Sequence, residues 1–324
     1  MCGLVGMAGN LTKDDRNMFR QMLIVDAIRG HHSTGVAAIN DKREVGVFKK
    51  ALNPIDFMQL QQFDRVVGAD SQVLMGHNRY ATVGKINNET AHPFENNGWV
   101  GAHNGTLRMW HALEDANRYT VDSECLIHNV ANYGFEDTFR KVHGAFAVSL
   151  YDSKEHKLHL LRNKERPLYV GWKHDRTVMY WASEAWMIRN LAQRCGIKLH
   201  EEFISLAVNK RLEFQLPKWK VSKIEDMKVV DVEVPEEKKP IPLYNQGGAT
   251  YRAGSQSANA TSRQQTASSS STDNNAGKGT VSPIRGSVGY ERSSPLPLPP
   301  ELQSLNTGKF QAFFPLGSSN VSGV

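Results

Sequence analysis

The sequence has 324 residues, a net charge of +6 at pH 7, 40% hydrophobic residues and three cysteines, Cys2, Cys125 and Cys195. Three widely separated cysteines exclude a disulfide framework and a zinc knuckle. No stretch approaches the ~20 apolar residues needed to span a bilayer, and no signal peptide is visible. We therefore expect a cytoplasmic protein without membrane contact. Basic residues alternate with acidic ones, as in NKERPL, which argues against a nucleic-acid partner.

Short runs rich in β-branched and aromatic residues predict nine strands. These strands cover residues 2–8, 34–40, 45–50, 72–80, 99–105, 145–152, 157–163, 168–172 and 178–184. Helical spacing predicts three helices, over 14–30, 122–134 and 183–196, each closed by a glycine: Gly30, Gly134 and Gly196. Many antiparallel strands with few helices favour an α+β layered domain.

The composition changes sharply after about Tyr244. We expect a folded domain over residues 2–235 and a tail over 245–324 that is rich in Ser, Asn, Gly and Pro. Such a composition buries too little apolar surface to offset its ordering entropy, so the tail is predicted to be disordered. Within it, SPLPLPP favours polyproline II. The terminal KFQAFFPLG is either a docking motif or an inert end.

The second residue is a cysteine followed by the apolar run GLVG. Removal of Met1 is expected because the next residue is small, and it would give Cys2 both a thiol and a free α-amino group. The thiolate is the nucleophile, and an α-amine with a pKa of about 7.7–8.0 can take the thiol proton. One residue would then supply nucleophile and base. A cysteine placed by chance in an apolar strand is the alternative.

Four polar residues lie where the predicted strands end or a helix begins: Arg79, Asn104, Gly105 and Asp122. Each has a structural alternative, since Asn104 and Gly105 read as a turn, Asp122 as a helix cap and Arg79 as the partner of a surface acid. Together they match an amino-acid amide: Arg for the α-carboxylate, Asp for the α-ammonium, and an Asn side chain with a Gly N–H for an oxyanion.

Six ordered motifs support this interpretation: MCGLVG, RGHHSTG, GHNRYAT, ETAHPF, AHNG and DSE. HGAFAVSLYD, NKERPLYVG and YWASE follow in the same order. Over residues 2–230 the chain resembles the class II glutamine amidotransferase domain, as in amidophosphoribosyltransferase, glucosamine-6-phosphate synthase, asparagine synthetase and glutamate synthase. The resemblance implies the N-terminal nucleophile hydrolase fold, a four-layer αββα sandwich of two antiparallel sheets.

The resemblance also implies a role for each matching residue. By this resemblance Cys2 is the nucleophile and base, and Asn104 and Gly105 form the oxyanion hole. Arg79 binds the α-carboxylate of glutamine and Asp122 its α-ammonium, while Thr82 and His92 line the glutamine pocket. Arg29 and Gly30 belong to the loop that braces the nucleophile. His32 stands where the family usually has Asp, and Asn78 replaces Thr. His31 and His32 also suggest a metal site, but no third ligand with suitable spacing lies nearby.

The resulting hypothesis is a glutamine amidotransferase that hydrolyses the side-chain amide of L-glutamine through a Cys2 thioester and needs no cofactor or metal. The sequence contains neither a GxxxxGK loop nor an SGG(L/V)DS loop, so we expect a separate acceptor protein for the ammonia. Three alternatives stay open: a glutaminase that acts alone, an enzyme for another amide, and a catalytically inactive relative that serves as a binding or assembly module.

Overall fold

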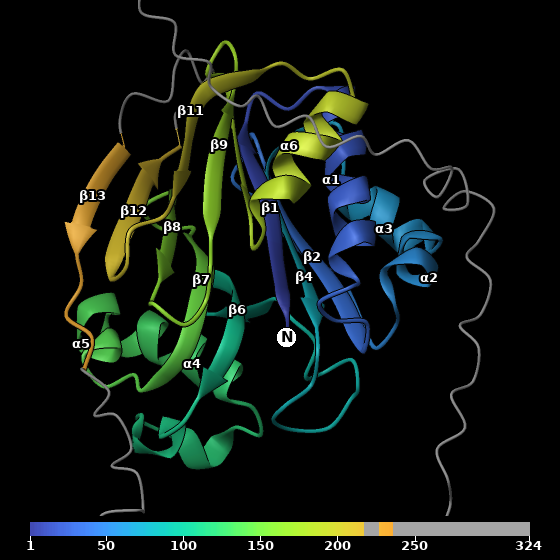
Figure 1. The fold of residues 1–324 in the computed structure, drawn as a ribbon. Helices are drawn as coiled ribbons and strands as arrows, with labels where there is room; N and C mark the ends of the chain where they lie inside the picture. Colours follow the sequence, from blue (N-terminus) through green and yellow to red (C-terminus); the bar gives the residue numbers. More distant parts are fainter. Residues whose placement is uncertain (217–226, 236–324) are drawn as a thin grey trace, which may run out of the picture. The chain divides into compact units, whose positions relative to one another are not determined.

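A computed structural model describes residues 1–216 and 227–235, and they form two antiparallel β-sheets (Figure 1). The first sheet has seven strands in the order β11-β9-β10-β1-β4-β2-β3. Their bounds are β1 Gly3–Gly9, β2 Ser33–Asn40, β3 Val45–Lys50, β4 Ser71–Arg79, β9 Tyr169–Lys173, β10 Val178–Ala182 and β11 Leu199–Ser205. The N-terminal strand therefore lies inside the sheet, between β4 and β10.

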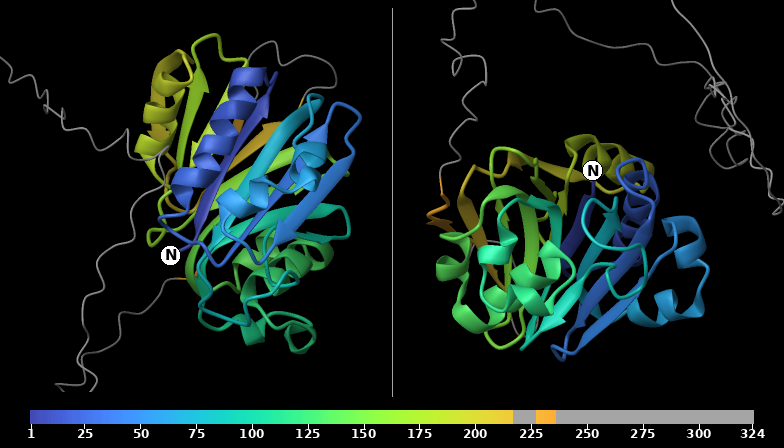
Figure 2. Two further views of the ribbon diagram at one scale, coloured as in Figure 1. Left: turned by 90° about the vertical axis from the view of Figure 1, so that its right-hand side faces the viewer. Right: turned by 90° about the horizontal axis from the view of Figure 1, so that it is seen from below.

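The second sheet has six strands in the order β13-β12-β8-β7-β6-β5. Their bounds are β5 Phe94–Asn96, β6 Trp99–Leu107, β7 Gly144–Asp152, β8 Lys157–Arg162, β12 Lys210–Gln215 and β13 Met227–Asp231. The long β6–β7 pair runs from Trp99↔Asp152 to Leu107↔Gly144. The two sheets stack face to face between helices, as both views of Figure 2 show.

Helices cover the outer face of each sheet. On the first sheet lie α1 Lys13–Asp26, α2 Pro54–Met58, α3 Gln61–Val66 and α6 Ala185–Arg194; on the second lie α4 Asp122–Tyr133 and α5 Phe135–Phe139, with the short 3₁₀ turns η1 Trp110–Ala112 and η2 Ala116–Arg118 beside them. The layers follow the order helix, sheet, sheet, helix, which confirms the predicted αββα sandwich. No helix in the described part of the chain is long and apolar enough to cross a membrane.

Strand alternation separates the core into layers. On β1, Leu4 and Ala8 point between the sheets, where they pack with residues such as Trp181. Val5 and Met7 point to the helices α1 and α6. A third cluster lies between the second sheet and α4. Each fully buried large side chain contributes about 1.5–3 kcal/mol, so the N-terminal strand is held firmly on both faces.

Helix α1 begins at a capping box: the Thr12 hydroxyl accepts the Asp15 N–H at 3.3 Å, and the Asp15 carboxylate accepts the Thr12 N–H at 2.7 Å. The prediction that this helix runs to Gly30 is wrong, because α1 ends at Asp26. Tighter turns follow, including a bond of 2.9 Å from the Arg29 N–H to the Asp26 carbonyl. These turns bring Arg29 back toward the start of β1.

The nine predicted strands and three predicted helices are all present, with ends shifted by a few residues. The placement of Asn104 and Gly105 in a turn is wrong, because both lie inside β6, opposite Ala147 and Phe146. The side chain of Asn104 is fully buried between the sheets, so tertiary packing overrides the turn preference of the Asn-Gly pair. The predicted tail over 245–324, with its two short motifs, lies outside the described residues.

Candidate active site

Cys2 lies directly before β1 and is 7% exposed. Its Sγ atom contacts one peptide on each side of Tyr80: the Tyr80 N–H donates to Sγ at 3.3 Å, and the thiol faces the Tyr80 carbonyl at 3.4 Å. Burial raises the pKa of the Cys2 thiol, while the Tyr80 backbone, the chain's amino group and the Arg79 guanidinium act in the opposite direction. The sulfur is therefore held in place by backbone next to a positive charge.

Arg29, predicted to brace Cys2, contacts its backbone. Its Nε donates to the Cys2 carbonyl at 3.1 Å, and its Nη1 pairs with Glu184. Gly3, the next residue, must be a glycine, because a Cβ atom there would come within 1.9 Å of the Asp26 carboxylate. Asp26 is completely buried, and this raises its pKa to about 7 although Arg29 opposes the shift.

Gly30, the other predicted brace residue, packs against the end of β4. A Cβ atom there would lie 2.5 Å from the Arg79 carbonyl carbon and 2.6 Å from the Tyr80 nitrogen. A side chain at this position would therefore push the peptide that contacts the Cys2 sulfur. Arg29 and Gly30 do not line the pocket itself.

Arg79 is the last residue of β4 and is 3% exposed, so it is not the partner of a surface acid. Its guanidinium donates to the Val83 carbonyl, to the Lys85 carbonyl at 2.9 Å and to the Thr90 hydroxyl at 2.9 Å. Three of its five N–H groups are thus engaged by the segment 80–90 that follows β4. The other two N–H groups have no partner in the part of the chain that the structure describes.

Asn104 and Gly105 extend from the second sheet toward β1. The Asn104 Nδ2 donates to the Ser183 hydroxyl at 3.4 Å, and the same hydroxyl accepts the Leu4 N–H at 2.9 Å. Phe146 lies opposite Gly105, and both of its backbone groups bond to Asn163: its N–H donates to the Asn163 Oδ1, and its carbonyl accepts the Asn163 N–H. The Gly105–Phe146 pair is therefore not hydrogen-bonded, and the Gly105 N–H points away from β7.

Asp122 begins α4, where the helix dipole favours a carboxylate. Its Oδ2 accepts the Leu107 N–H at 2.8 Å, and its Oδ1 accepts the Ser123 N–H at 2.9 Å. The capping residue is Val121, so the proposed N-cap role of Asp122 is wrong by one position. The Ser123 hydroxyl also contacts Asp122 and the Nδ1 of His103, at 3.2 and 2.9 Å.

Three buried histidines continue this polar region between the sheets. The His77 and His92 rings stack with centroids 3.9 Å apart, and the His77 Nε2 faces the His103 carbonyl at 3.1 Å. Burial lowers the pKa of His77 to about 3 and lowers the pKa of His92 and His103 as well. All three are therefore neutral at pH 7. Neither ring nitrogen of His92 has a hydrogen-bond partner among the described residues.

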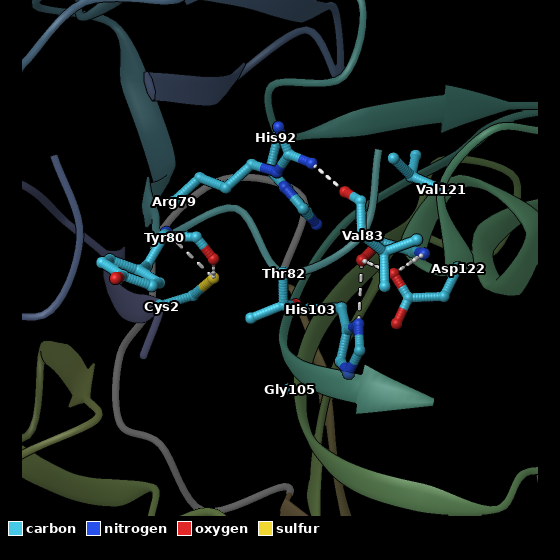
Figure 3. A pocket seen from close by; sticks show the side chains of 11 residues that line it. Cys2, Arg79, Tyr80, Thr82, Val83, His92, His103, Gly105, Val121 and Asp122 are labelled. Atoms are coloured by element: carbon cyan, nitrogen blue, oxygen red, sulfur yellow. Dashed lines mark hydrogen bonds between the residues drawn. The ribbon is translucent and has the colours of Figure 1, made fainter. Parts of the chain in front are cut away.

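These side chains enclose one pocket, with Cys2 and Tyr80 at one side and Asp122 at the other (Figure 3). It is lined by Cys2, Arg79, Tyr80, Thr82, Val83, His92, His103, Gly105, Val121, Asp122 and Ser123. The volume open to the centre of a water-sized sphere is about 10 Å³, room for about one water. A ligand larger than one water requires the pocket to widen before it binds. The segment 80–90, which carries Thr82 and Val83, is exposed or half-buried up to Thr90.

The structure thus brings six predicted residues into one pocket: Cys2, Arg79, Thr82, His92, Gly105 and Asp122. The Thr82 hydroxyl lies 3.0 Å from that of Thr106. Sequence reasoning missed Asp26, Ser183 and Glu184 behind the nucleophile. The last two belong to the motif YWASE, which was an available signal, whereas nothing in the sequence distinguishes Asp26 from a solvated helix residue. No group of three potential metal ligands occurs in residues 1–216 and 227–235.

Comparison with known proteins agrees with this geometry. The sequence model of the glutamine amidotransferase domain matches residues 64–233, more than half of the chain. The chain therefore belongs to the glutamine amidotransferase domain family, in the class II form with an N-terminal cysteine. The matched range includes Arg79, Asn104, Gly105 and Asp122 and begins after Cys2.

The chain is also similar to curated proteins over part of their length. The chain is 26% identical over 233 residues to glutamine–fructose-6-phosphate aminotransferase (isomerizing) of Streptococcus agalactiae serotype III, covering 66% of this chain and 37% of the relative. It is 28% identical over 191 residues to the enzyme of that name from Staphylococcus aureus strain Mu50, covering 53% of this chain and 30% of the relative. The chain thus spans about a third of the length of these relatives.

The fold resembles that of glutamine phosphoribosylpyrophosphate amidotransferase from B. subtilis, with a TM-score of 0.56 and 20% identity over 71% of this chain and 49% of that one. A structure of the allosteric regulatory enzyme of purine biosynthesis matches with a TM-score of 0.55 and 21% identity. At this identity the likeness supports the fold alone.

Proposed function

We propose that this protein hydrolyses the side-chain amide of L-glutamine through a thioester on Cys2 and that the ammonia passes to a separate acceptor protein. The observation that carries the proposal is the single pocket in which a buried, backbone-held cysteine, an arginine fork and a carboxylate converge. Figure 3 shows the sulfur and the Asp122 carboxylate at opposite sides of this pocket, as an amino acid attacked at its side-chain end requires.

In the proposed reaction Cys2 Sγ attacks the amide carbon of glutamine. The Asn104 Nδ2 and the Gly105 N–H stabilise the negative oxygen that develops. The Cys2 α-amine, free after Met1 is removed, takes the thiol proton and passes it to the departing nitrogen, which leaves as ammonia. Water then attacks the thioester, the amine takes its proton, and glutamate and the thiol are released. Met1 is 62% exposed, which supports its accessibility to a peptidase.

Arg79 and Asp122 would bind the α-carboxylate and the α-ammonium of glutamine. The two guanidinium N–H groups not engaged by segment 80–90 match a carboxylate fork. Thr82 and His92 would line the pocket, and the unpartnered ring nitrogens of His92 support a contact with substrate or water. This reaction draws on no metal or cofactor.

In this proposal the acceptor of the ammonia is a second protein. The proposal includes a folded domain over 2–235 and a docking role for the tail over 245–324. It also includes a cytoplasmic location, which the three free cysteines support.

The test is the intact mass of the full chain before and after incubation with the glutamine analogue 6-diazo-5-oxo-norleucine. We expect loss of Met1 and one adduct, which the Cys2→Ala variant lacks and the matched Cys195→Ala variant keeps. Ammonia release from glutamine should fall below detection in Cys2→Ala, by at least about 10⁴-fold. A retained Met1, or a processed Cys2 that excess reagent does not label, would overturn the proposal and favour a binding module.

A further inference from the structure

His32 contacts the end of β4 in three ways. Its backbone N–H donates to the Arg79 carbonyl at 3.0 Å. Its side-chain Nδ1 accepts the Ala81 N–H at 3.0 Å. Its ring stacks on the Tyr80 ring, with centroids 4.7 Å apart and an interplanar angle of 26°. Residues 79, 80 and 81 are therefore each held by one part of a single residue.

Tyr80, the middle one of these three residues, is also the residue whose backbone contacts the proposed nucleophile, Cys2. The Tyr80 N–H donates to the Cys2 sulfur at 3.3 Å, and the Tyr80 carbonyl faces the thiol at 3.4 Å. Beyond Ala81, the chain turns into the exposed segment that must open for glutamine. Without the bond to Ala81, motion of that segment would reach Tyr80 and the sulfur directly.

We propose that His32 is a positioning residue of the nucleophile: its unprotonated Nδ1 anchors Ala81, and so keeps the Tyr80 backbone against the Cys2 sulfur while the rest of segment 80–90 moves. This inference rests on the proposed function for its meaning in catalysis. It assigns a purpose to a histidine that does not line the pocket.

The anchor requires a particular protonation state. Nδ1 accepts a hydrogen bond only when the proton of the neutral ring is on Nε2, and a protonated ring has no acceptor at all. The groups with charge or a titratable proton that face His32 are His31, Arg79, Tyr80 and the amino terminus. Partial burial lowers the pKa of His32, and His31, Arg79 and the amino terminus lower it further. The neutral, accepting form therefore predominates at pH 7.

Two substitutions separate the acceptor from the ring. His32→Asn keeps an acceptor, because the Asn Oδ1 is as many bonds from Cα as the His Nδ1, but it removes most of the stacking surface. His32→Phe keeps a ring that can stack on Tyr80 but has no acceptor. His31→Ala is the matched control, since this exposed neighbour makes a ring contact with His32 and no hydrogen bond to segment 80–90 in the described structure.

The first readout does not depend on glutamine. The full chain is alkylated with iodoacetamide from pH 5 to 10, and peptide mapping follows Cys2 with Cys195 as an internal reference. The Tyr80 backbone bond lowers the pKa of the Cys2 thiol, so its loss should shift the Cys2 profile to higher pH in His32→Phe. His32→Asn and His31→Ala should follow the unmodified chain, and Cys195 should be unchanged in all of them.

The second readout is glutamine hydrolysis. We expect kcat to fall about three- to ten-fold in His32→Phe, as for the loss of one neutral hydrogen bond, with KM nearly unchanged. His32→Asn should retain the rate at pH 7 and exceed the unmodified chain at acidic pH, where His32 becomes protonated. Thermal unfolding of each variant checks that the fold is intact.

The outcomes of the two proposals are distinguishable. If the unmodified chain hydrolyses glutamine and His32→Phe matches it in both readouts, the role of His32 is overturned and the proposed function stands. If the unmodified chain does not hydrolyse glutamine but His32→Phe alone shifts the alkylation profile, the positioning role stands and the proposed function fails. Equal defects in His32→Phe and His32→Asn would also overturn the anchor, because the acceptor would then be irrelevant.

Discussion

Polar groups on the two sides of β1 have different surroundings. On the side facing the second sheet, the sulfur of Cys2 and the guanidinium of Arg79 are held mainly by backbone of segment 80–90. On the side facing the helices, Asp26 is buried beside Gly3 with both carboxylate oxygens unpartnered among the described residues. In the proposed function the groups on the first side bind substrate, whereas Asp26 on the second side is completely buried.

This difference separates binding chemistry from support. The substrate side has groups whose partners can move, so substitutions there should change turnover and affinity. The helix side fixes the Cys2 carbonyl through Arg29, so substitutions there should act through stability and its pH dependence. The following experiments test this separation.

Asn104→Ala should have the largest effect. Loss of one oxyanion donor is expected to lower kcat about 10²–10³-fold with little change in KM. The measurement is steady-state ammonia release from glutamine. Asn17→Ala, on the exposed face of α1, makes the same side-chain change away from the pocket and should leave kcat and KM unchanged. A turnover equal to that of the unmodified protein would show that Asn104 does not stabilise the oxyanion.

Arg79→Lys should raise KM for glutamine about 10- to 100-fold, because an ammonium cannot form the two parallel bonds of a guanidinium to a carboxylate. An ammonium has three N–H donors, so serving the three acceptors on segment 80–90 that Arg79 now holds would leave none for the substrate. Arg20→Lys on α1 is the matched control. An unchanged KM would mean that Arg79 only supports the segment.

Asp26→Asn tests the helix side. The pKa of Asp26 is raised from 3.8 to about 7, so between pH 5 and 7 the folded state keeps a proton that the unfolded state has lost. Stability therefore falls as pH rises through this window, by about 3 kcal/mol at 1.36 kcal/mol per unit. The Asn variant should lack this loss. Urea unfolding at pH 5 and 8 measures it, with Asp64→Asn as the surface control; parallel curves for all three proteins would contradict the assignment.

Lys141→Gln should have the smallest effect. Lys141 pairs with Glu114 at 2.7 Å, and both side chains are 47% exposed. Water screens such a pair, so the unfolding midpoint should stay within about 1 °C of the original. A large shift of the unfolding midpoint would show that this exposed ion pair contributes strongly to stability. It would contradict the expectation that the groups behind β1 matter more.

Much of the fold was predictable because strand and helix signals are local. The central strands are short apolar runs, and the ordered motifs identified Cys2, Arg79, Asn104, Gly105 and Asp122. Strands such as β12, with the sequence KRLEFQ, were missed because they are charged and lie near the edge of the second sheet. Their pairing partners, rather than their own composition, make them strands.

The supporting residues were less predictable. Asp26 looks like a solvated position at the end of a helix, and only its packing on Gly3 reveals the buried carboxylate. The anchor at His32 depends on a contact between residues 32 and 81. Such long-range contacts leave no periodic signal in one sequence.

The position of β1 also has a consequence during protein synthesis. Its two neighbours in the sheet are β4 and β10, and the second of these ends at Ala182. Ribosomes add about 5–20 residues per second, so about 10–40 s pass before that neighbour has been made. During this interval the amino terminus cannot be enclosed by its finished sheet. Under the proposed function, a peptidase can therefore remove Met1 from the nascent chain before folding buries Cys2, and Met1 itself stays 62% exposed afterwards.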